Sequence, residues 1–175
     1  MMSGNSASRM DSGRNVDTQE WALLVLRGFF GVVYLANGLA KLTGVGSVTI
    51  GPWRTFLINL GTTQGILSHN AKSSIGLYHD FAVNVVLPHF NLFGPMITLA
   101  EIAVGLGLLT GVFGRLAALG GTLLALNVAV SAIGAGEWTF EYLIEIIPLA
   151  CLVVLRIPVL PAIPRGWLAR LPSWA

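Results

Sequence analysis

Long apolar stretches separated by short polar ones run along most of the chain. Four of these stretches have about the 20 residues that an α-helix needs to cross a bilayer, and they cover residues 21–42, 92–113, 115–135 and 138–156. The pattern therefore predicts an all-α integral membrane protein. We expect a four-transmembrane-helix bundle that forms one domain over residues 21–156.

The long connection between the first two predicted spans, residues 44–91, is itself partly apolar. Within segment 74–87 the apolar positions recur every three or four residues, at Ile75, Tyr78, Ala82 and Val85. This spacing is typical of a helix with one buried stripe. Segment 49–60 is also apolar but too short to span. We therefore expect an outer loop that carries short interfacial helices.

Composition and charge support this class and orient the chain. Hydrophobic residues make up 54% of the sequence and charged residues only 10%, against roughly 25% charged in soluble domains. Most arginines lie near the two ends of the chain or in the turn at Arg115, so the positive-inside rule places both termini in the cytoplasm of a prokaryotic-type plasma membrane. Residues 1–20, rich in Ser, Gly, Asn and Asp, are expected to form a disordered cytoplasmic tail, and residues 157–175 a Pro-rich cytoplasmic tail.

Several kinds of redox and binding site are excluded by residue counts. Cys151 is the only cysteine, so no redox disulfide can form within the chain. The histidines, His69, His79 and His89, all lie outside the predicted spans and ten residues apart. This arrangement disfavours paired haem ligands and a preformed metal site. The net charge of +2 comes from scattered basic residues, which gives no nucleic-acid signal.

The first predicted helix carries polar and small residues on one face. At 100° per residue this face contains Arg27, Gly31, Tyr34, Gly38 and Lys41, with Asn37 beside it. Small residues let helices approach closely in lipid, so this face should point into the bundle. Arg27 is expected to extend its side chain to the cytoplasmic interface instead.

The other predicted helices each supply a polar residue at a similar depth. These are Glu101 on the second, Asn127 on the third and Glu145 on the fourth, with Glu141 nearer the interface. A charge facing lipid costs about 2.5–3.5 kcal/mol or more, so we expect these groups to converge with Asn37 and Lys41 in the outer half of the bundle, flanked by Tyr34. Lys41 should pair with Glu101 or Glu145. The remaining carboxylate would then be available to take a proton.

The order of these motifs resembles the DoxX family of small four-helix membrane proteins. The first helix has Arg27-x3-Gly31-x2-Tyr34-x3-Gly38-x2-Lys41-Leu42, the second has Gly94-Pro95 and Glu101-x3-Gly105, and the turn after it reads Gly114-Arg115-Leu116-Ala117-Ala118. The stretch "GEWTFEYL" at the start of the fourth helix is similar to the DoxD branch, the small subunit of thiosulfate:quinone oxidoreductase. The resemblance implies a membrane subunit associated with quinone chemistry, and it carries over to Lys41 and Glu101. The 44–91 loop is longer than the family's usual connection.

Three functional hypotheses follow. In the first, the chain is a subunit of a quinone-linked redox complex with an oxidoreductase partner, soluble or membrane-bound. Glu101 and Glu145 would then be the catalytic proton acceptors, and the quinone would be bound by Tyr34, Asn37, Lys41 and Asn127. In the second, the polar cluster only locks the bundle of a non-enzymatic assembly protein. The third, a small-solute carrier, would require two copies in a homodimer, because no internal repeat is evident.

Overall fold

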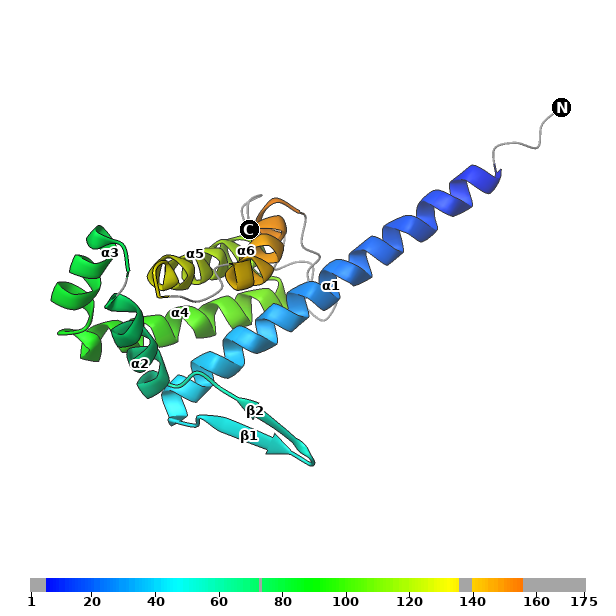
Figure 1. Cartoon of the computed structure of the whole chain (residues 1–175). Coiled ribbons are helices and arrows are strands. Elements are labelled where there is room, and N and C mark those ends of the chain that lie inside the picture. The colour runs from blue at the N-terminus through cyan, green and yellow to red at the C-terminus, as the bar shows by residue number, and fades with distance from the viewer. Residues whose placement is uncertain (1–5, 73, 136–139, 156–175) are drawn as a thin grey trace.

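The computed structural model describes residues 6–72, 74–135 and 140–155, with side chains described from Glu20 onward. Its elements in chain order are α1 (Ser6–Thr43), β1 (Ser47–Ile50), β2 (Trp53–Phe56), α2 (Leu60–Ala71), α3 (Gly76–Phe81), the π-helical turn η1 (Ala82–Val86), α4 (Phe90–Thr110), α5 (Gly114–Ala132) and α6 (Phe140–Val154). Figure 1 shows α1 crossing beside α4, with α5 and α6 packed together and α2, α3 and the strands at one end.

Three of the described helices are long and apolar enough to cross a membrane: residues 20–43 of α1, and α4 and α5. They correspond to the first three predicted spans. The predicted fourth span, residues 138–156, corresponds to α6, which has 15 residues. At 1.5 Å per residue α6 is about 22 Å long, shorter than the roughly 30 Å hydrocarbon core of a bilayer. The described residues thus support a mostly helical membrane protein with three candidate spans.

The first helix is longer than expected. It begins at Ser6, so residues 6–20, for which we predicted a disordered tail, continue the spanning helix as a projecting extension (Figure 1). No proline interrupts this segment, and extending a helix that already exists costs far less than starting one. The expected Pro-rich tail, residues 157–175, lies outside the described residues.

The helices α1 and α4 pack backbone against backbone. A Cβ atom on Gly105 of α4 would lie 2.6 Å from the main-chain nitrogen of Leu35, and one on Gly38 of α1 would lie 2.7 Å from Ile102. Side chains at these positions would force the helices apart. Glycines therefore permit the contact, as is common where helices meet in lipid. The core beside this contact is formed by Phe30, Tyr34, Val104, Leu108, Leu149 and Leu152, with smaller residues of α5.

The loop contains an antiparallel hairpin that corrects the all-α prediction. Strands β1 and β2 pair with Ser47 opposite Phe56 and Ile50 opposite Trp53, joined by Gly51 and Pro52. Gly51 has φ +60°, which suits the first central position of a type II′ turn, and the fixed φ of proline suits the second. The segment 49–60 is thus largely extended, because this turn pairs residues 53–56 with residues 47–50.

Short helices fill the rest of the loop. Helix α2 begins after Asn59, whose side chain accepts a hydrogen bond from the N–H of Thr62 at 2.9 Å. Helix α3 and η1 occupy the segment where periodicity predicted a helix, but the wider π turn changes its register. Val86 is buried there and Val85 is exposed. The last buried position of the segment is therefore 86 and not 85, the position that α-helical spacing predicted.

Candidate intramembrane polar site

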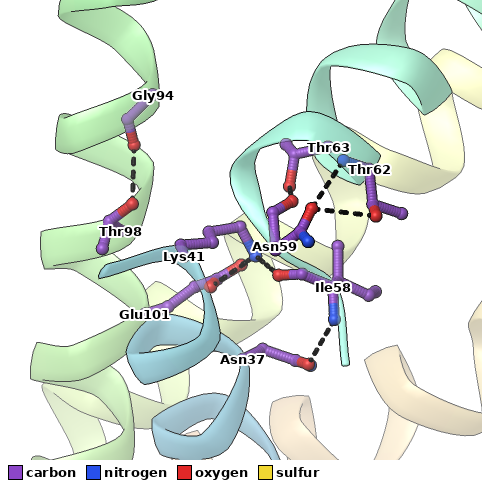
Figure 2. Close-up of polar contacts among 9 residues, drawn as sticks. All are labelled: Asn37, Lys41, Ile58, Asn59, Thr62, Thr63, Gly94, Thr98 and Glu101. Carbon is purple, nitrogen blue, oxygen red and sulfur yellow. Dashed lines mark hydrogen bonds and ion pairs between the residues drawn. The ribbon is translucent and has the colours of Figure 1, made fainter. Parts of the chain in front are cut away.

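The Thr43 end of α1 carries a buried ion pair. Lys41 Nζ donates hydrogen bonds to Glu101 Oε1 at 2.9 Å and to Glu101 Oε2 at 2.8 Å, so it contacts both oxygens of the carboxylate. The Lys41 side chain is 1% exposed and that of Glu101 is 15% exposed. The prediction that Lys41 pairs with an acid from another helix thus agrees with the structure, which selects Glu101 of α4 over Glu145 of α6 (Figure 2).

Close packing of α1 on α4 explains this choice of partner. Gly38 lies one turn before Lys41, and a Cβ atom there would lie 3.4 Å from Cβ of Glu101. Because Gly38 has no side chain, α4 comes near enough for Glu101 to reach Lys41. The contact between α1 and α6 is much smaller than that between α1 and α4. The absence of a side chain at Gly38 therefore determines that Lys41 pairs with Glu101 of α4.

The main chain of the loop completes the site. Lys41 Nζ also donates to the carbonyl oxygen of Ile58 at 2.9 Å, and the N–H of Ile58 donates to Asn37 Oδ1 at 3.1 Å. Figure 2 shows Ile58 held from both sides by these two α1 side chains. Sequence reasoning missed Ile58, because a main-chain carbonyl gives no signal in residue type. The nearest available signal was the Asn59 helix cap that fixes the residue beside it.

Tyr34 and Glu145 form a neighbouring part of the site. The Tyr34 hydroxyl is buried and donates a hydrogen bond to the carbonyl oxygen of Gly121 on α5 at 2.9 Å. Glu145 is half-buried on α6, near enough to interact electrostatically with both the Tyr34 hydroxyl and the Glu101 carboxylate. The side chain of Lys41 is 1% exposed and its hydrogen bonds go to Glu101 and Ile58, so Glu101 and not Glu145 is its partner acid.

Asn127 does not join this site. Its Oδ1 accepts a hydrogen bond from the Tyr78 hydroxyl at 3.3 Å, which ties α5 to α3 in the loop. Burial raises the pKa of Tyr78, and its hydrogen bonds to Ser131 and Asn127 partly oppose that effect. Asn70 of α2 donates to Ser131 at 3.1 Å in the same region. The prediction placed Asn127 by its depth alone, and depth does not say which neighbouring element a side chain meets.

Two arginines bind helix ends. Arg27 was expected to reach the interface, but it is 2% exposed and donates to the carbonyl oxygen of Leu109, in the last turn of α4, at 3.3 Å. Arg115 donates to the carbonyl oxygens of Val154 and Leu155 at the end of α6, each at 3.4 Å. A cation near a helix C-terminus is favourable, because it complements the partial negative charge of the free carbonyl groups. Arg27 is therefore a buried cap rather than an interfacial anchor.

The histidines lie in the loop, away from the ion pair. His79 and His89 each hydrogen-bond through Nδ1 to a main-chain carbonyl oxygen, those of Ala71 and Val85. Within the described ranges, no three His, Cys, Asp or Glu side chains form a group that could hold a metal ion. The chemistry that this region offers is therefore that of carboxylates, an ammonium, a phenol and amides.

Comparisons with known proteins give one family. The family model described as DoxX matches residues 22–134, which include α1 from its first apolar turn, the whole loop, α4 and α5. Neither the curated proteins nor the solved structures contain a match. The match includes Lys41 and Glu101 and ends before α6, which carries Glu145.

Proposed function

Because the chain belongs to the DoxX family, we propose that it is the membrane subunit of a quinone-linked redox complex of the DoxD type, one that oxidises thiosulfate or thiols. The chain would lie in a prokaryotic-type plasma membrane with both termini in the cytoplasm. Helix α6 would act as the fourth span; residues 138, 139 and 156 of that predicted span lie outside the described residues. Electrons would come from an oxidoreductase partner, since a single cysteine cannot form a redox disulfide within the chain.

Glu145 is the observation that carries this proposal. It is a half-buried acid on an apolar helix, and the ammonium of the site is buried against Glu101 and Ile58 instead. Intramembrane acids are costly, and they commonly mark proton-transfer or ligand sites. Glu145 is thus the group best suited to hold and transfer a proton, and Glu101 is better suited to hold Lys41 in place.

The residues fit a quinone headgroup once their roles are revised. A quinone bound here would supply two-electron redox chemistry. Because reduction of a quinone to a quinol takes up two protons, the headgroup would need one hydrogen-bond donor and one proton donor. Asn37 Oδ1 is engaged by Ile58, which directs its amide NH2 group away from that contact and leaves it as the donor. Glu145, in its protonated form, would supply a proton to the headgroup. The Tyr34 hydroxyl, whose own proton is donated to Gly121, would orient Glu145 by accepting a hydrogen bond from the protonated carboxyl group. Lys41 and Glu101 would hold α1, α4 and the loop together.

The test compares two acids of α6. In membranes containing the full complex, Glu145→Gln should lower thiosulfate- or thiol-dependent quinone reduction by about 100-fold, the scale of a lost general acid. Glu141→Gln is the matched control, because Glu141 lies one turn earlier on the same helix and is exposed; its rate should remain that of the unaltered protein. Equal rates for both variants would refute a role for Glu145 in proton transfer.

A second function is favoured by the burial of Lys41. Its side chain is 1% exposed, and its ammonium is held between the Glu101 carboxylate and the carbonyl oxygen of Ile58. This is what a purely structural lock in an assembly protein requires. On this hypothesis Glu101→Gln should reduce the recovery of the intact complex, while the rate per recovered complex stays constant. A lower rate at normal recovery would contradict it.

A further inference from the structure

The β1–β2 hairpin has two chemically different faces. Residues paired across the strands lie on the same face, and successive residues alternate between faces. From the observed register, one face carries Val48, Ile50, Trp53 and Thr55, and the other carries Ser47, Thr49, Arg54 and Phe56. A hydrogen bond from Arg54 to Ser47 and the placement of the Arg54 cation 5.4 Å from the Phe56 ring centre agree with this division. We call the first set the apolar face.

The protein leaves the apolar face uncovered. Ile50 is 71% exposed and Trp53 is 79% exposed, and Figure 1 shows the hairpin projecting away from the helices. An isolated two-stranded hairpin is only marginally stable in water. Large apolar side chains gathered on one face of such an element indicate that something else covers them.

The hairpin begins where a spanning helix ends. The candidate span over residues 20–43 contains 24 residues, about 36 Å of helix, which is enough to cross a hydrocarbon core of about 30 Å. Only three residues separate Thr43 from β1. At the base of the hairpin the N–H of Leu57 donates to the carbonyl oxygen of Gly46 at 3.0 Å, and Ile58 is held by Lys41 and Asn37. The strands are therefore fixed at the level of the bilayer surface.

We propose that the apolar face of the hairpin binds the lipid surface at the Thr43 end of α1. Tryptophan is enriched where membrane meets water, and Trp53 lies at the tip of this face. Arg54 lies on the opposite face, where it remains hydrated and can approach lipid phosphates. No acidic residue occurs between Lys41 and His79, so this part of the chain suits anionic headgroups. The unpaired strand edges need water, which places the hairpin in the interface rather than in the hydrocarbon core.

The experiment uses two adjacent positions on opposite faces. In a Cys151→Ser background, which removes the only cysteine, Ile50→Cys and Thr49→Cys are each labelled with an environment-sensitive fluorophore. Each protein is then reconstituted into vesicles of phosphatidylcholine and phosphatidylglycerol. A doxyl-labelled lipid should quench the label at position 50 several-fold more strongly than the label at position 49. A water-soluble quencher should show the opposite order.

Two results would overturn the proposal. Equal quenching of both labels by the aqueous quencher would place the hairpin in water. Protection of the label at position 50 from both quenchers would show that a protein surface, here a second copy of the chain, covers the apolar face. Since either cysteine could disturb folding, each variant is first compared with the parent by size-exclusion chromatography in detergent. Direct quenching of tryptophan fluorescence by doxyl lipid, in the unaltered protein and in Trp53→Ser, gives a second measurement, and Trp53→Ser should lose a quenched component.

Discussion

Replacing Lys41 by methionine should strongly destabilise the protein. Methionine keeps most of the length of the side chain but removes the ammonium, so the largely buried Glu101 carboxylate loses both its bonds and Ile58 loses its donor. Removing one partner of a buried ion pair typically costs about 3–5 kcal/mol, because the other charge remains buried without compensation. We expect Lys41→Met to lower the free energy of unfolding by an amount in this range.

The double variant Lys41→Met/Glu101→Met measures how strongly the two charges depend on each other. With both charges gone, no uncompensated charge remains, and replacement of a whole buried pair by apolar side chains is often close to neutral. The double variant should therefore be more stable than Lys41→Met, although Ile58 still lacks its donor. The measurement is the unfolding of each protein in mixed micelles with increasing SDS, followed by circular dichroism. Costs of the two single variants that add within about 0.5 kcal/mol would refute the coupling.

Three further predictions follow from packing, capping and titration. Gly105→Ala should separate α1 from α4 and cost about 1–3 kcal/mol, because the added carbon overpacks their contact. Gly28→Ala should instead be stabilising, because no atom lies within 4 Å of the added carbon and alanine favours a helix more than glycine does. Melting temperatures in detergent test both variants. Arg115→Gln should lower stability by about 0.3–1 kcal/mol through loss of its contact with the end of α6, measured by SDS unfolding. Burial raises the pKa of Tyr78, so the folded state keeps the phenol proton at a pH at which the unfolded state loses it. The free energy of unfolding should therefore fall as pH rises above about 10. It should fall less steeply in Tyr78→Phe, which lacks the phenol.

Most of the spans, and the pairing of Lys41 with an acid from another helix, follow from sequence. Length and apolarity predict four spans, because a bilayer imposes both, and three of them are candidate spans in the described residues. The glycines beside Lys41 on α1 indicate a close neighbour. What they do not state is which acid the neighbour supplies, since Glu101 and Glu145 lie at similar predicted depths. The backbone contact at Gly105 decides this, and it depends on how α4 and α1 cross.

The loop was the least predictable part, for two physical reasons. The turn at Gly51 and Pro52 is a recognisable signal, but apolar residues on both sides of it also fit a short helix, and only cross-strand pairing distinguishes the two. The role of Ile58 is carried by its peptide group, which every residue possesses. Asn127 was misplaced because its partner, Tyr78, comes from this loop and not from another spanning helix.

The hydrogen bonds from Lys41 to the carbonyl oxygen of Ile58 and from the Ile58 N–H to Asn37 make the loop part of the polar site. They also limit what each acid can do. A ligand that binds Lys41 must first displace either Glu101 or the carbonyl oxygen of Ile58, because the ammonium is buried between them. Displacing Ile58 would also release the base of the hairpin, which the same residue fixes to α1. Chemistry at Lys41 therefore requires movement of the loop. Glu145 makes no hydrogen bond to Ile58 among the described contacts, so in the proposed function proton transfer would fall to Glu145, while Lys41 and Glu101 keep the helices and the loop in register.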